Sequence, residues 1–130
     1  MEGYLVAARI AGLIAACPSN KSLTHSVISG FTKLVDVLTP TQITNAEKKG
    51  CIVLSTNTTG QIWIDSAINT LVTPSDNQDD GWKKIRRTKT RYELITRCND
   101  QADSLIGKVD NDTNGRATVV SQLQGIVNAW

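Results

Sequence analysis

The pattern of hydrophobic and polar positions is most regular in the last third of the chain. Between residues 94 and 106 the apolar side chains recur at helical spacing and share one face: Leu94, Ile95, Cys98, Ala102, Leu105 and Ile106. The pattern predicts a helix with one buried stripe of apolar residues. Near residues 88–90 either this stripe shifts to a neighbouring face or the helix bends. Gly107 predicts the end of this helix, because glycine readily adopts the left-handed conformation that closes a helix.

A second helix is predicted from about Arg116 to the end of the chain, after a polar turn at residues 110–115. Its apolar positions fit one helical face: Ala117, Val120, Leu123, Ile126 or Val127, and Trp130. Two helices joined by so short a turn are expected to pack side by side as a helical hairpin.

The first apolar run, from Tyr4 to Ala16, is apolar on nearly every face and carries only one charge, at Arg9. It predicts a helix that is buried on most sides and ends before Pro18. The run is too short to cross a bilayer. A secretory signal is an alternative interpretation, but Glu2 and the lack of a basic cluster count against it.

The middle of the chain mixes weak and strong signals. Between Ser22 and Val37 the apolar positions mix two periods, and we expect strand pieces joined by a turn at Ser29 and Gly30. A helix is predicted to start at Thr39, because a threonine three residues before a glutamine allows reciprocal capping and Pro40 suits the first turn. It should run to Lys49 and end at Gly50.

Two short β-branched runs predict a β-hairpin, Cys51 to Ser55 and Gln61 to Asp65, joined by a loop that ends in glycine. Ile62 and Ile64 should lie on one face of it and Trp63 on the other. Together these elements predict an α+β fold in which a small hairpin packs with several helices and the chain ends in a helical hairpin. At 130 residues we expect a single domain over residues 1–130.

Composition adds little to the assignment of function. The net charge is only +2, so any functional electrostatics must come from local clusters. The three cysteines, Cys17, Cys51 and Cys98, are widely spaced in apolar contexts, which favours buried free thiols in a reducing compartment. The single histidine, His25, has no ligand-type residue near it in sequence. No spacing suggests a catalytic triad or a phosphate-binding loop, so we do not expect an enzyme.

The turn at residues 110–115 resembles the first half of an EF-hand calcium loop between two helices. Asp110, Asp112 and Asn114 supply oxygen ligands at alternate positions and Gly115 follows them. The position of the bidentate glutamate is occupied by Ser121, so a tight site lacks its strongest ligand. A solvated turn is the favoured interpretation, and a calcium-binding helix-loop-helix module is an alternative.

A basic stretch precedes the predicted helical hairpin, interleaved with Trp82 and Tyr92. Its members are Lys83, Lys84, Arg86, Arg87, Lys89 and Arg91. Such a stretch can follow a phosphate backbone while an aromatic ring stacks on bases, so a nucleic-acid-binding module at residues 82–91 is a second alternative. The acidic loop before it and two aspartates after it offer partners within the chain. We therefore expect a solvated or protein-docking surface and no nucleic acid.

Several short blocks occur in an order and spacing that resemble a known family. They are Gly12 to Ala15 with Pro18, Asn20 to Thr24, Gly50 to Leu54, Ile68 to Leu71, Trp82 to Arg86, and Ile106 to Val109 with Asn111, Gly115 and Arg116. Across almost the whole chain these blocks resemble the C-terminal region of contractile tail sheath proteins of bacteriophages and phage-like particles.

This resemblance implies a structural role, with no catalytic residue and no cofactor. Sheath subunits stack as rings around an inner tube, and contraction of the sheath drives the tube through a cell envelope. The implied partners are neighbouring sheath subunits and the inner tail tube protein, with no membrane, and the basic stretch is expected to face one of the two partners. The implied location is a virion tail or phage-like particle that is assembled in the cytoplasm of a bacterial host.

The resemblance also implies that the chain is a fragment of a larger sheath subunit. Relatives link neighbouring subunits by exchanging terminal extensions, each adding a strand beside a small sheet of the next subunit. The receiving sheet is expected to be the hairpin at residues 51–65, while the donating extensions lie outside this chain. We therefore expect the fragment to be monomeric or weakly self-associating and unable to build tubes.

Overall fold

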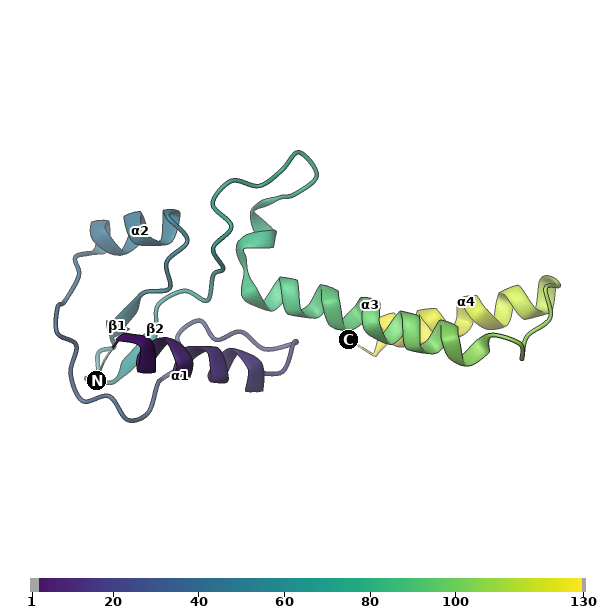
Figure 1. The fold of residues 1–130 in the computed structure, drawn as a ribbon, viewed down its shortest axis with the longest axis horizontal. Coiled ribbons are helices and arrows are strands. Elements are labelled where there is room, and N and C mark those ends of the chain that lie inside the picture. Colours follow the sequence, from purple (N-terminus) through teal and green to yellow (C-terminus); the bar gives the residue numbers. More distant parts are fainter. Residues whose placement is uncertain (1–2, 130) are drawn as a thin grey trace. The chain divides into compact units, whose positions relative to one another are not determined.

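The computed structural model describes residues 3–129. Helices and a small sheet follow one another along the chain (Figure 1), and their bounds are α1 Gly3–Ala16, α2 Pro40–Lys48, β1 Leu54–Thr56, β2 Ile62–Ile64, the 3-10 helix η1 Asp80–Lys83, α3 Ile85–Leu105 and α4 Thr113–Asn128. The predicted α+β class is confirmed. The chain forms two compact units that divide after Thr88. This division does not test the expectation of a single domain, which stays a prediction.

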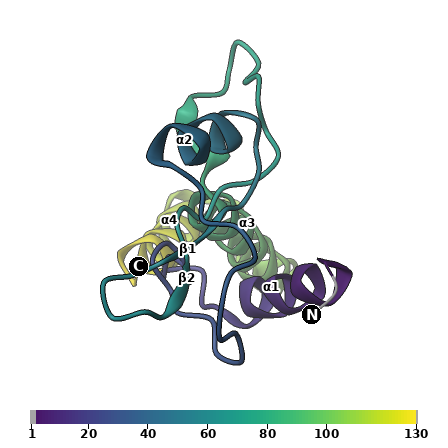
Figure 2. The same ribbon diagram turned by 90° about the vertical axis from the view of Figure 1, so that its left-hand side faces the viewer.

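The first unit is built around a very small sheet. Strands β1 and β2 are antiparallel, with Ser55 opposite Trp63. They confirm the predicted hairpin, although each strand has three residues. Ile62 and Ile64 point into the core, at 2% and 1% exposure, and Trp63 lies on the other face. Figure 2 shows how much of this unit consists of loops around the sheet.

Strand pieces predicted between Ser22 and Val37 are mostly absent, and that prediction is wrong apart from one position. Val27 forms an isolated bridge with Trp63, and the nearby His25 N–H donates to the Ile64 carbonyl at 2.7 Å. Because β1 already occupies one edge of β2, only one further stretch of backbone can pair with this strand. The rest of the segment is irregular.

Helix α1 confirms the predicted helix but not its predicted burial. None of its residues is buried, and Tyr4 and Leu5 are 68% and 45% exposed. Val6, Ile10 and Leu13 are half-buried and share one side of the helix. The prediction of burial on most sides is wrong because this unit covers only one side of the helix.

Helix α2 begins and ends as predicted. The Thr39 N–H donates to Gln42 Oε1 at 2.9 Å and the Gln42 N–H donates to Thr39 Oγ1 at 3.4 Å, which completes a capping box. Pro40 is the first helical residue, and Gly50 follows the helix with φ 75°. These contacts satisfy backbone groups that a helix end leaves without partners.

The start of α3 is held by the loop that follows β2. Ile68 forms an isolated bridge with Lys84, and the Asn69 N–H donates to the Lys83 carbonyl at 2.8 Å. The Asn69 side-chain amide also donates to the Trp82 carbonyl at 2.7 Å. Backbone and side-chain hydrogen bonds therefore fix the position at which the basic stretch leaves the loop.

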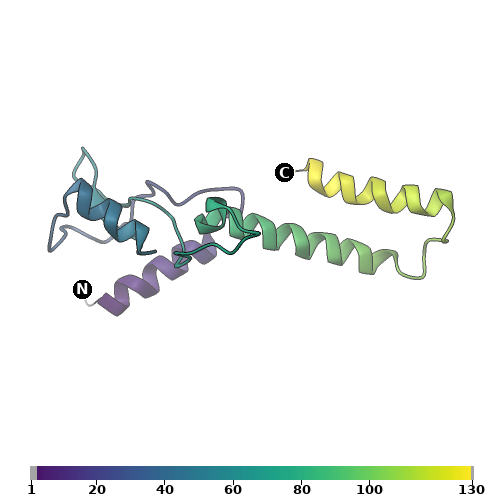
Figure 3. The same ribbon diagram turned by 90° about the horizontal axis from the view of Figure 1, so that it is seen from above.

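The second unit is the predicted helical hairpin of α3 and α4 (Figure 3). Helix α3 ends at Leu105 and Gly107 has φ 73°, as predicted. Only half of its predicted stripe faces inward: Leu94, Cys98 and Leu105 are half-buried. The other apolar members of this stripe, Ile95, Ala102 and Ile106, are exposed. Three positions of α4 that were predicted to face inward are also exposed, namely Ala117, Val120 and Val127. Trp130 lies outside the described residues. The two helices therefore bury fewer apolar side chains between them than the sequence pattern predicted.

The cysteines are free thiols, as predicted, but they are less buried than predicted. Cys17 and Cys98 are partly exposed and Cys51 is exposed. Their apolar neighbours in sequence gave a misleading indication of burial.

Candidate functional site

The basic stretch runs through η1 and the first turns of α3. Lys83 Nζ lies 2.9 Å from Asp80 Oδ1, and Lys84 Nζ donates to Ser66 Oγ at 3.4 Å. The hydrogen bond from Lys83 and its positive charge lower the pKa of the Asp80 carboxyl below its ordinary value. The stretch is therefore partly neutralised by neighbours in the chain.

Arg87 packs against the turn at the start of η1. Its Nη1 lies 3.5 Å from Asp79 Oδ2, and the Asp79 side chain accepts the Gly81 N–H at 3.0 Å. A Cβ at Gly81 would overlap the Arg87 guanidinium group. The missing side chain at Gly81 lets Arg87 lie flat over the turn that Asp79 caps.

The basic residues of α3 do not form one face. Arg87 and Arg91 are four residues apart and share one side of the helix, whereas Arg86 and Lys89 are three apart and share another. Arg86 is exposed, and the Arg91 guanidinium lies 5.9 Å from the centre of the Tyr92 ring. The basic side chains of α3 therefore do not form one continuous track of the kind that follows a phosphate backbone.

The turn between α3 and α4 differs from an EF-hand loop. The Asp112 carboxylate accepts the Gly115 N–H at 2.6 Å and caps α4, which already begins at Thr113. Asn114 therefore lies in the first turn of α4, and every later position that an EF-hand would use for ligands also lies within this helix. The calcium alternative does not fit this geometry. Within residues 3–129, no group of three or more His, Cys, Asp or Glu side chains is placed to hold a metal ion.

The small sheet has one edge that is open. The Asp65 N–H donates to the Val53 carbonyl, and the Asn57 N–H donates to the Gln61 carbonyl. In an antiparallel pair, hydrogen-bonded positions alternate with positions that are not hydrogen-bonded, so Ser55 is the hydrogen-bonded position of β1 between Val53 and Asn57. Leu54 and Thr56 are the intervening positions. Their backbone N–H and C=O groups point away from β2, and in the described part of the chain no other backbone pairs with them. An open strand edge of this kind is a template for an added strand.

The outer face of the same sheet carries a polar cluster that the sequence did not reveal. Trp63 Nε1 donates to Ser55 Oγ at 2.6 Å, and Ser55 Oγ donates to Asp65 Oδ1 at 2.9 Å. The His25 ring stacks on Trp63 with centroids 4.2 Å apart. His25 has φ 60°, which is uncommon for a residue with a side chain. The only sequence signal was that Trp63 alternates with two core isoleucines.

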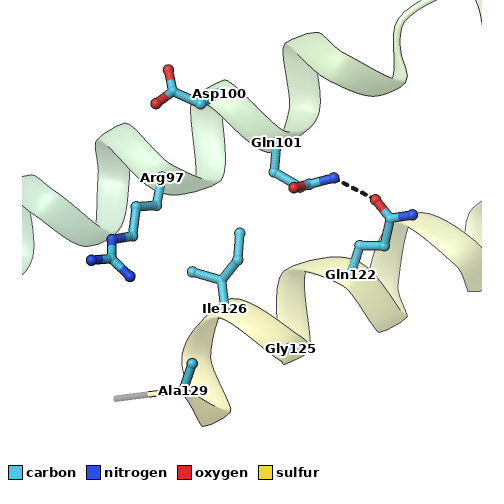
Figure 4. A pocket seen from close by; sticks show the side chains of 7 residues that line it. All are labelled: Arg97, Asp100, Gln101, Gln122, Gly125, Ile126 and Ala129. Atoms are coloured by element: carbon cyan, nitrogen blue, oxygen red, sulfur yellow. Dashed lines mark hydrogen bonds between the residues drawn. The ribbon is translucent and has the colours of Figure 1, made fainter.

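Two grooves run along the helical hairpin, on its two sides. One has a volume of about 680 Å³ and a mixed lining, in which Arg97, Asp100, Gln101 and Gln122 lie beside small and apolar residues (Figure 4). A hydrogen bond from Gln101 to Gln122 joins the two helices at this groove. The other groove, of about 480 Å³, is lined mainly by apolar side chains near the connecting turn. The two helices therefore present different chemistry on their two sides.

Neither groove contains the arrangement of a nucleophile and a base that hydrolytic catalysis needs. Among residues 3–129, none of the helices is both long and apolar enough to cross a membrane. The surfaces that remain as candidates for function are the open edge of β1, the basic stretch and the two sides of the hairpin.

Comparison with solved structures finds this fold in sheath tail proteins. The chain superimposes on the sheath tail protein of Desulfitobacterium hafniense with a TM-score of 0.84 and 21% identity, over 99% of this chain and 30% of that one. The sheath tail protein of Listeria innocua gives a TM-score of 0.72 and 20% identity, over 98% of this chain and 31% of that one. The chain thus spans about a third of the length of either protein.

The resemblance inferred from short sequence blocks is confirmed at the level of the fold. Neither the protein-family models nor the curated proteins give a match to the sequence. At about one identical residue in five, the agreement between the structures rests on the arrangement of the elements more than on individual side chains.

Proposed function

We propose, on the premise that this chain has the fold of a segment of sheath tail proteins, that it is a structural part of a tail sheath subunit. The observation that carries the proposal is the superposition over 99% of the chain with a TM-score of 0.84. In this role the chain belongs to a larger subunit that assembles with copies of itself around an inner tube. Contraction of that assembly drives the tube through a cell envelope. The chain acts through its surfaces and not through catalysis.

The open edge of β1 supports a linkage between subunits through an added strand. Leu54 and Thr56 direct backbone groups away from the hairpin, and β2 is already paired on both sides, by β1 and by the bridge at Val27. A terminal extension from a neighbouring subunit would pair with β1 and meet these groups. A two-stranded hairpin also gains stability from a further strand.

The basic stretch supports a contact with a neighbouring subunit or the tube. Arg86 is exposed, while Lys83 and Arg87 are paired with aspartates of the same chain. Charges at the rim of an interface mainly set specificity and encounter rate. Among these residues, Arg86 is therefore the one whose charge reversal disturbs the chain itself least.

Assembly of the full-length protein that contains this chain tests the proposal. Thr56→Pro removes an N–H that points away from β2, so the hairpin keeps its own ladder while an added strand loses a hydrogen bond. We expect Thr56→Pro to melt close to a Thr56→Ala control and to assemble poorly under conditions in which the control forms tubes. Tube formation by Thr56→Pro that equals the control would exclude the β1 edge as the linkage.

A second arm of the same experiment tests the basic stretch. Arg86→Glu should leave the fold unchanged and reduce assembly, whereas reversal of Lys33, an exposed residue of an irregular loop, serves as the matched control. Electron microscopy of the present chain alone should show no tubes. Ordered hollow tubes made by this chain alone would show that the linkage needs no terminal extensions.

A further inference from the structure

The apolar groove of the helical hairpin is an incomplete core. It lies between the end of α3 and the start of α4 and is lined by Ala102, Leu105, Ile106, Val119 and Val120 together with residues of the turn. Ile106 is 75% exposed and Val120 is 53% exposed. Helices of this length gain most of their stability from burying an apolar face, which this hairpin does only in part.

The apolar surface continues along the hairpin beyond the groove. Ile95 and Val127 are 42% and 55% exposed. An α-helix turns by about 100° per residue, so Ile95, Ala102 and Ile106 lie within roughly 40° of one another around the axis of α3 and share one face. The two charged residues that line the groove, Asp110 and Arg116, have opposite signs and lie at its turn end. The surface that requires a cover is therefore long, apolar and close to neutral.

Helix α1 has an outward side of matching character. Leu5, Ala8, Ala11 and Gly12 are exposed and uncharged. The one charge of this helix, Arg9, turns away to donate a hydrogen bond to Ser29 Oγ at 3.0 Å. A surface helix normally carries polar residues on its outward side, so this side is also suited to burial.

Gly12 gives an independent indication that another element approaches α1 closely. It lies in the interior of the helix, where glycine is destabilising relative to alanine. Among residues 3–129, no atom outside its own helix backbone and chain neighbours lies within 4 Å of the position that a Cβ would occupy. No contact within the described chain explains the glycine, whereas a closely packed neighbouring helix does.

We infer that the outward side of α1 of one copy lies in the α3–α4 groove of a second copy of this chain. The inference rests on the proposed function, since it names one contact by which subunits meet. Small residues on α1, Ala8, Ala11 and Gly12, leave hollows for the protruding side chains of Ile106 and Val120, as in the packing of ridges into grooves. The α1 surface carries no charge, and the two charged residues of the groove, Asp110 and Arg116, lie at its turn end with opposite signs, so the contact leaves no buried charge unpaired along its length.

The size of the contact fits an assembly and not a stable dimer. Helix α1 has 14 residues and is about 21 Å long at 1.5 Å per residue. One face of such a helix buries less than the roughly 800 Å² per partner of a stable interface. Because the two surfaces differ, each copy offers α1 to one neighbour and the groove to another, which makes the contact head-to-tail. Many weak contacts of this kind reinforce one another in a ring or helical array.

Complementary variants test the inference with the chain as it is. Ala11→Glu disables the α1 surface and Ile106→Glu disables the groove, while Val35→Glu, at a position 98% exposed in an irregular segment, is the control. In sedimentation at high protein concentration, wild type and Val35→Glu should self-associate weakly. Each of the two surface variants alone should lose association by roughly ten-fold or more, because burying a charge is costly.

An equal mixture of the two variants gives the decisive result. The intact α1 of Ile106→Glu can still enter the intact groove of Ala11→Glu, so the mixture should form one-to-one dimers and nothing larger. Self-association of Ala11→Glu equal to wild type would mean that hairpins pair with each other, which overturns the inference. Failure of the mixture to associate where wild type does also overturns it.

A disulfide trap decides the case in which association is too weak to sediment. With the three native cysteines replaced by serine, Ala8→Cys on one chain and Val120→Cys on another should form a mixed disulfide dimer on oxidation. Absence of that dimer, or an internal disulfide when one dilute chain carries both cysteines, overturns the inference. Normal tube assembly of the full-length Ile106→Glu protein would reject this contact and leave the proposed sheath function intact.

Discussion

Replacing Gly115 by alanine should loosen the connection between α3 and α4. Gly115 is the one buried residue of α4, and a Cβ there would overlap the Asp110 carbonyl oxygen and lie 2.8 Å from Val109 Cγ1. The nearest atom belongs to the backbone, so it cannot move aside by a change of rotamer. The turn or the first turn of α4 must shift instead, and the Gly115 hydrogen bond to Asp112 shifts with it.

The expected change in the free energy of unfolding is the sum of two opposing effects. Alanine in place of a helical glycine stabilises by roughly 0.5–1 kcal/mol, whereas forcing an extra carbon into a packed site costs typically about 1–3 kcal/mol. We expect a net loss of about 1–2 kcal/mol in the free energy of unfolding, because the clash with the backbone cannot be relieved cheaply. At roughly 4 °C per kcal/mol for a chain of this size, the melting temperature should fall by about 4–8 °C.

Gly125→Ala is the matched control, since Gly125 lies in the same helix and nothing within 4 Å of its Cβ position opposes a side chain. It should raise stability by up to about 1 kcal/mol. Urea unfolding followed by helical circular dichroism measures both variants on one scale. If Gly115→Ala proves as stable as Gly125→Ala, the close approach of Asp110 to Gly115 does not exist in solution and the reasoning fails.

Three further changes test other contacts. Thr39→Ala should cost about 1 kcal/mol by removing the cap of α2, while Thr41→Ala in the same helix should cost less than half of that in chemical denaturation. Ile64→Ala should cost about 2–5 kcal/mol, since this side chain is 1% exposed, and a cost below 1 kcal/mol would contradict the assigned core. Because Lys83 lowers the pKa of Asp80, the contribution of their pair is present above the ordinary aspartate pKa of about 3.9 and is lost as pH falls through the lower folded-state pKa. Carbon NMR of the carboxyl group measures this pKa, which should rise toward the ordinary value in Lys83→Gln.

Local signals in the sequence predicted the ends of elements well. The capping box at Thr39, the glycines after α2 and α3, and the alternation around Trp63 depend on neighbours within a few residues, so the pattern alone determined them. Burial was predicted poorly, because it depends on partners. The apolar pattern of α1 indicates which side chains avoid water, but it does not indicate whether this chain or another molecule covers them.

In the candidate site, too, features set by neighbouring residues could be predicted from the sequence, whereas contacts between distant residues could not. The positions of the basic stretch were evident from the sequence, and the structure does not test the role predicted for them. The contact between Arg87 and Asp79 required the turn that Gly81 permits. The cluster of His25, Trp63 and Ser55 joins segments that are distant in sequence, and nothing in the spacing of these residues predicts that they meet.

Contacts in the first unit also determine the order in which the chain can fold. The Ala67 N–H donates to Thr24 Oγ1, and the bridge between Ile68 and Lys84 closes a second loop, so the small core is complete only after most of the chain has been synthesised. Contacts that are distant in sequence form slowly because closing the intervening loop costs entropy. The α3–α4 hairpin needs only its own short turn. Refolding should therefore show a fast helical phase followed by a slower phase in which tryptophan fluorescence reports the closing of the sheet around Trp63.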